Sequence, residues 1–79
     1  MVYTVKGSSD VKELEVTFGT FNTSSDALNF IKLCFNESLH NRDSYYNWTK
    51  YIVDEEQNGQ IVNEVIYTPD YKNKKLMST

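Results

Sequence analysis

The sequence predicts an α+β fold with the element order ββαββ, in which a four-stranded antiparallel sheet carries one amphipathic helix packed on one face. Three observations predict it. Residues 12–18 alternate between apolar and polar side chains, as a half-buried strand does. Residues 24–40 repeat apolar side chains at helical spacing, and Asn58-Gly59 separates two strand-forming segments, as in a tight hairpin. With 79 residues, the chain is long enough for one domain only.

Two strands are expected before the helix. Residues 1–6 form a short strand, and a turn follows at residues 7–10. The alternating segment places apolar side chains on one face and Glu or Thr on the other; the apolar ones are Leu14, Val16 and Phe18. Gly19 interrupts this alternation, and Phe21 falls out of phase with Phe18, which predicts a β-bulge.

The helix is expected to begin after Thr23 and to end near His40. Thr23, with Asp26 three residues later, resembles a capping box, and the acid suits the positive end of the helix dipole. One face of the helix is apolar, and its members are Ala27, Leu28, Ile31, Cys34, Phe35, Ser38 and Leu39. This face is expected to pack on the sheet.

A hairpin is expected after the helix. Residues 45–53 and 61–68 are rich in β-branched and aromatic side chains, and they are expected to pair through the turn at Asn58-Gly59. Because proline disfavours a continuing strand, Pro69 is expected to end the second one. Residues 1–69 then form the domain, and residues 70–79 form a frayed basic tail.

A two-residue turn sets the register of this hairpin, so that Ile52 faces Val65 and Lys50 faces Tyr67. Both faces are then apolar. One face would hold Trp48, Ile52, Ile61, Val65 and Tyr67, and the other Tyr51, Val53, Val62 and Ile66. Since one helix covers only one face of a sheet, the second face is left for solvent, a second copy of the chain or another protein. Two simpler interpretations stay open: a longer loop that shifts the register, or tyrosines that cover the outer surface.

The sequence contains no recognisable catalytic machinery. Cys34 lies on the apolar stripe of the helix, and His40 is placed six residues later, off that face, so that no Cys-His nucleophilic pair is expected. Residues 54–64 approach the spacing of a calcium loop, but the closing acid Glu64 comes one position early. No catalytic residue, metal or cofactor is therefore predicted, and a weak calcium-binding module stays only as an alternative.

The charge distribution argues against nucleic acid as the main partner. Residues 1–68 carry ten acids and five bases, and residues 69–79 carry one acid and three lysines, which gives the formal net charge of −3. An acidic body repels phosphate backbones. A single-strand binder that stacks bases on sheet aromatics remains an alternative, as does a structural or assembly protein. No membrane partner is expected, because no apolar run is long enough to span a bilayer.

In size, acidity and α+β layout, the chain resembles the small acidic proteins of phages and mobile elements, which include anti-CRISPR and other anti-defence proteins. The resemblance implies a stoichiometric inhibitor that acts in the host cytoplasm by occluding a defence protein. A single cysteine and the absence of a signal peptide also favour a cytoplasmic location. From the residues, we expect a non-enzymatic protein-binding module or homodimer. Its expected contacts are the sheet face of Tyr51, Val53, Val62 and Ile66 and the acidic turn of Asp54, Glu55 and Glu56.

Overall fold

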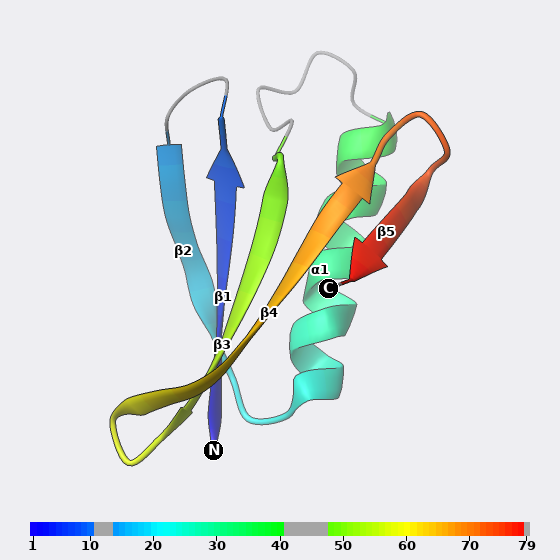
Figure 1. The fold of residues 1–79 in the computed structure, drawn as a ribbon. Coiled ribbons are helices and arrows are strands. Elements are labelled where there is room, and N and C mark those ends of the chain that lie inside the picture. Colours follow the sequence, from blue (N-terminus) through cyan, green and yellow to red (C-terminus); the bar gives the residue numbers. More distant parts are fainter. Residues whose placement is uncertain (11–13, 41–47, 79) are drawn as a thin grey trace.

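A computed structural model describes residues 1–10, 14–40 and 48–78, and these ranges contain five strands and one helix (Figure 1). The elements are β1 (Val2–Ser9), β2 (Leu14–Phe21), α1 (Ser24–His40), β3 (Lys50–Gln57), β4 (Gln60–Asp70) and β5 (Lys75–Ser78). The predicted α+β class, with one helix and an antiparallel sheet, is confirmed. The predicted strand segments at 12–13 and 45–47 lie outside the described residues.

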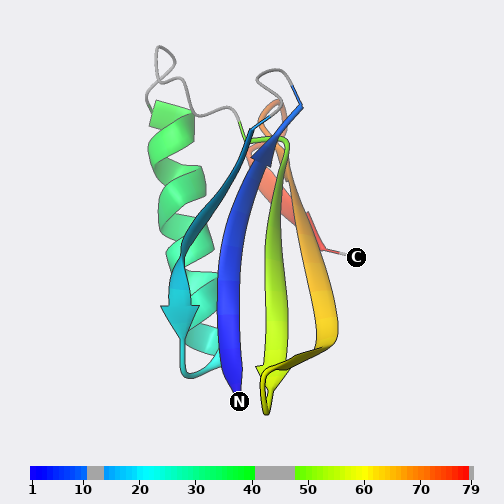
Figure 2. The ribbon, with the colours of Figure 1, turned by 90° about the vertical axis from the view of Figure 1, so that its left-hand side faces the viewer.

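The five strands form one antiparallel sheet in the order β2-β1-β3-β4-β5. The N-terminal strand therefore lies inside the sheet, between β2 and β3. The helix forms a second layer on one side, which the turned view of Figure 2 shows clearly. We call this side the helix face of the sheet, and the other side the outer face.

The fifth strand corrects the prediction of four strands and a frayed tail at residues 70–79. β4 continues through Pro69 to Asp70, and β5 pairs with its last four residues. The Asp70 carboxylate closes the intervening turn, because it accepts hydrogen bonds from the backbone N–H and the side-chain amide of Asn73 at 3.1 and 2.8 Å. Leu76 then packs against the core, which holds β5 in place.

The helix begins with the predicted cap. The backbone N–H of Asp26 donates to Thr23 Oγ1 at 3.1 Å, and this bond satisfies one of the free donors of the first turn. Four residues of the predicted apolar stripe are buried: Ala27, Ile31, Phe35 and Ser38. The helix therefore packs on the sheet as its periodicity predicts.

The core lies between the helix and the sheet. Its buried cluster is Val5, Ala27, Ile31, Trp48, Tyr51 and Val53. The predicted bulge in β2 is confirmed: Val5 pairs with Gly19 and Lys6 with Thr17, so that Phe18 is the extra residue. The Phe18 ring packs over Gly7, where an added Cβ would come within 2.6 Å of it, and it meets Trp48 edge-on at 5.3 Å between ring centroids.

Candidate interaction surface

The hairpin between β3 and β4 decides which side chains reach each face of the sheet. Its turn follows the prediction, since Asn58 and Gly59 both have positive φ, as a type I′ turn requires. Glu56 then pairs with Ile61 in the predicted register. The next pair is Glu55 with Asn63, so that Val62 is left as the extra residue of a bulge.

This bulge moves the rest of the hairpin by one residue. Ile52 pairs with Ile66 in place of Val65, and Tyr51 pairs with Tyr67. Because side chains alternate along a strand, a shift of one residue in β4 exchanges its two faces relative to β3. Val65 and Tyr67 therefore join the helix face, where both pack against the core.

The predicted binding face of Tyr51, Val53, Val62 and Ile66 is corrected by this register. Tyr51 and Val53 are 0% and 5% exposed and belong to the core under the helix, so they are not surface contacts. Ile66 pairs with Ile52 on the outer face, and Val62 is exposed at the bulge. The four residues do not share a face, because the bulge shifts the pairing of β4 with β3 by one residue.

The predicted acidic turn is also divided between the two faces. Asp54 is only 2% exposed and lies on the outer face, where Glu56 follows two residues later. Glu55 points to the helix face and accepts a hydrogen bond of 3.4 Å from the side-chain amide of Asn63. Of these three acids, therefore, only Asp54 and Glu56 can act on a common surface.

The outer face carries a regular block of nine side chains from β1, β3 and β4. Three cross-strand rows form it: Val2, Glu56 and Ile61; Thr4, Asp54 and Glu64; and Lys6, Ile52 and Ile66. We call these nine residues the outer patch. Its rows combine acidic and aliphatic side chains, and the helix lies on the opposite side of the sheet.

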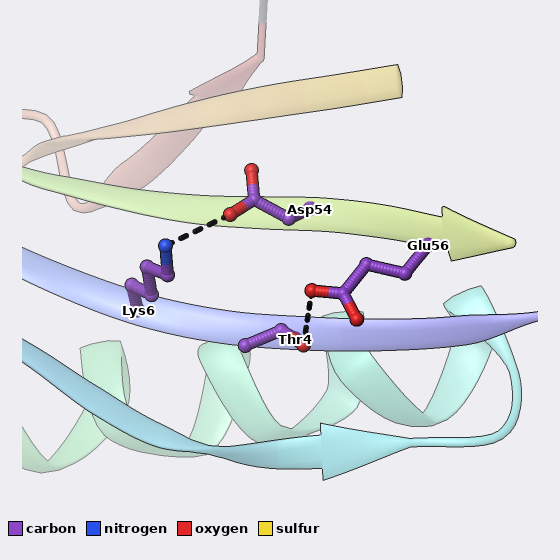
Figure 3. Close-up of polar contacts among 4 residues, drawn as sticks. All are labelled: Thr4, Lys6, Asp54 and Glu56. Carbon is purple, nitrogen blue, oxygen red and sulfur yellow. Dashed lines mark hydrogen bonds and ion pairs between the residues drawn. The ribbon is translucent and has the colours of Figure 1, made fainter. Parts of the chain in front are cut away.

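An ion pair lies in the middle of the outer patch. Lys6 Nζ is 3.0 Å from Asp54 Oδ2, as Figure 3 shows, and the two side chains are 28% and 3% exposed. The hydrogen bond from the ammonium to Asp54 and the negative charge of this carboxylate raise the pKa of Lys6. Asp54 Oδ1 is buried and has no hydrogen-bond partner among the described residues.

Two further acids surround this pair. Glu56 accepts a hydrogen bond of 3.4 Å from the Thr4 hydroxyl, and Glu64 lies directly across from Asp54 on β4. Like charges directly opposite each other destabilise a sheet. Within ranges 1–10, 14–40 and 48–78, the only ion pair is that of Lys6 with Asp54. The outer patch therefore holds three carboxylates against one ammonium.

Six residues of the outer patch were absent from the predicted site: Val2, Thr4, Lys6, Ile52, Ile61 and Glu64. The first three alternate with Tyr3 and Val5 in β1, so the period of the sequence could have placed them on one face. The position of β1 beside β3 was not predictable in the same way. The order β2-β1-β3 brings residues near 4 next to residues near 54, and no local pattern signals that pairing.

Cys34 and His40 have different surroundings on α1. Burial raises the pKa of the half-buried Cys34 thiol, and Glu37 adds to the effect, so the thiolate is disfavoured. The exposed His40 ring contacts the Asn36 carbonyl oxygen through Nδ1 at 2.8 Å. Among the residues that the structure describes, no group of three His, Cys, Asp or Glu side chains is placed to hold a metal ion.

Comparison of the chain with protein-family models, curated proteins and solved structures finds no match. No helix in the described part of the chain is long and apolar enough to cross a membrane.

Proposed function

We propose that this chain is a non-enzymatic protein-binding domain that acts by occlusion, covering a surface of another protein with the outer face of its sheet. One observation carries the proposal: aliphatic side chains lie in rows with acids on the face of the sheet opposite α1. Val2 and Ile61 are 39% and 57% exposed. Aliphatic and charged side chains together on one open face favour contact with another protein surface.

The size of the face supports this role. Rows of a sheet that share a face are about 7 Å apart, so the outer patch spans roughly 14 Å along its strands. A standard interface contains about 20–30 residues on each side. The outer patch is therefore the centre of such an interface, and neighbouring residues of the outer face would form its rim. The rim residues are Ser8, Glu15, Thr17, Thr20, Lys50, Thr68 and Met77.

The single-strand nucleic-acid alternative has less support than protein binding. It requires aromatic side chains on an open sheet face, but Trp48 and Tyr51 lie in the core between sheet and helix. Among the described outer-face residues, none is aromatic. The acids of the outer patch would also repel phosphates. The calcium alternative has less support, since Asp54 and Glu56, two of its expected ligands, belong to the extended strand β3 and not to a loop that wraps an ion.

The proposal is tested by comparing two surface variants in affinity capture from extracts of the source organism. Val2→Ser/Ile61→Ser removes the most exposed aliphatic side chains of the outer patch. Leu33→Ser is the matched control, because Leu33 is 65% exposed on α1. Captured proteins are identified by mass spectrometry, purified and titrated by calorimetry.

We expect a partner that binds wild type and Leu33→Ser alike and loses affinity about tenfold or more for the double variant. Unfolding curves should show that both variants stay folded, because all three positions are exposed. A partner that binds the double variant as tightly as wild type would place the interface elsewhere and refute the proposal.

A further inference from the structure

We propose that the partner inserts an arginine side chain into the outer patch, with its guanidinium at Asp54 Oδ1 and Glu64 and its aliphatic stem over Ile52 and Ile66. The inference rests on the proposed function and specifies the chemistry of the partner. Figure 3 shows the centre of this site, where Asp54 bonds Lys6 through one oxygen only.

One oxygen of the Asp54 carboxylate has no hydrogen-bond donor among the described residues. A buried carboxylate oxygen without a donor is unfavourable, because water that would hydrate it has been removed. Lys6 satisfies Oδ2, and Oδ1 has no partner among the described residues. An incoming N–H donor would remove this penalty in the complex. The carboxylate is already fixed by Lys6, so its ordering costs little when the partner binds.

The outer patch carries a net negative charge. Asp54, Glu56 and Glu64 oppose Lys6 alone, which leaves a formal charge of −2 on a small area. A cationic group from the partner balances this charge. A second copy of the chain would bring two such acidic patches together if it docked on the same face, and their repulsion disfavours that dimer. The occupant is therefore a basic protein surface.

The carboxylates of Asp54 and Glu64 belong to directly paired residues. Asp54 and Glu64 face each other on neighbouring strands, where Cβ atoms are about 5 Å apart. A guanidinium is planar and has five N–H donors, so it can bridge two such acids, whereas an ammonium is a compact point charge. Glu64 is exposed on the strand beside Asp54, so its carboxylate is accessible to a partner.

Two aliphatic side chains lie in the row next to Asp54 and Glu64. Ile52 and Ile66 are cross-strand partners and both are partly exposed on the outer face. The long aliphatic stem of arginine packs on such side chains while its charged end reaches a polar group. Together, the two rows match an arginine in both charge and shape.

The inference is tested by NMR titration of the isotope-labelled full chain with the capped peptide Ac-Val-Arg-Val-NH2. The matched peptides carry lysine or the uncharged citrulline in place of arginine. We expect saturable shifts at the outer patch for the arginine peptide, with a dissociation constant on the order of millimolar for so small a ligand. The lysine peptide should bind several-fold more weakly, and the citrulline peptide about tenfold more weakly.

Two protein variants complete the test. Glu64→Gln should weaken the arginine peptide about tenfold, whereas Glu37→Gln, an exposed acid of α1, should not change its affinity. Equal binding of the arginine and citrulline peptides, no shift at the outer patch, or unchanged affinity in Glu64→Gln would overturn the inference. Such a failure is distinguishable from failure of the proposed function. The proposed function is tested by a different quantity, the affinity of the captured partner protein for Val2→Ser/Ile61→Ser.

Discussion

The two faces of the sheet are formed by alternate residues of the same strands, and they differ in what contacts their side chains. On the helix face, Tyr51 and Val53 of β3 are covered by α1 and its aromatic neighbours. On the outer face, Ile52 and Asp54 of the same strand lie on the side of the sheet opposite α1, and an ion pair to β1 provides the central contact. The cluster under α1 is apolar, whereas the outer patch combines four aliphatic side chains with four charged ones and Thr4. We infer that the outer face, which lies opposite α1, is the one that can receive a partner.

The largest expected difference between the faces is the cost of removing aliphatic side chains. Ile31 has no exposure and packs between helix and sheet, so Ile31→Ala should lower the free energy of unfolding by about 2–5 kcal/mol. Ile61→Ala on the outer face should change it by no more than about 0.5 kcal/mol. Urea denaturation measures both. A similar large loss in Ile61→Ala would mean that the outer face is covered in the isolated protein.

A smaller effect is expected from filling the space at Gly7. An alanine there needs the Phe18 ring to move, because its Cβ would lie 2.6 Å from Cε2 of that ring. Gly7→Ala should therefore cost about 1–3 kcal/mol. Gly19→Ala is the control, since nothing lies within 4 Å of its added Cβ. Thermal unfolding should show a lower midpoint only for Gly7→Ala, and equal midpoints would place Phe18 away from the helix face of β1.

The ion pair on the outer face should show an asymmetric response. Lys6→Met leaves the buried Asp54 carboxylate without its cation, so it should destabilise the fold by about 1–2 kcal/mol, less than for a fully buried pair because Lys6 is partly exposed. Asp54→Asn should cost less, because the Lys6 ammonium can turn to water. Denaturation of both single variants and the double variant gives their coupling. A cost that is larger for Asp54→Asn would contradict this account of the pair.

The smallest effect is expected at alkaline pH and belongs to the helix face. Burial, followed by the nearby Tyr71 hydroxyl, raises the pKa of Tyr51 above its ordinary value of 10.0. The unfolded chain then loses this proton at lower pH than the folded chain does. The stabilising contribution is complete below pH 10 and is lost as pH rises above it. Denaturation between pH 8 and 11 should show that the free energy of unfolding declines less steeply with pH in Tyr51→Phe than in wild type. An identical decline would exclude the Tyr51 hydroxyl as the cause of this pH dependence.

The elements with strong local signals were predictable from the sequence. The helix, its cap at Thr23 and the turn at Asn58-Gly59 depend on nearby residues, and the structure has each of them. The bulge at Phe18 was also predictable, because Gly19 interrupts the alternation there. These features share a cause within a few residues of where they occur.

Two features depended on packing and were not predictable. β5 has only four residues, and it becomes a strand because Leu76 reaches the core and β4 extends past Pro69 to pair with it. The bulge at Val62 has no glycine to signal it, and apolar residues near it fit either face. Its effect is large, since it places Val65 with Val53 in the core and leaves Ile66 outside.

The central claim is that the outer face is uncovered in the isolated chain, and methyl NMR with a soluble paramagnetic agent tests it most directly. We predict strong relaxation at Ile61, close to that at Leu33 of α1, weaker relaxation at Ile52 and Ile66, and little at Ile31. This order should not change with protein concentration. If Ile61 and Ile66 were as protected as Ile31, another layer would already occupy the outer face, and the outer patch could not receive a partner.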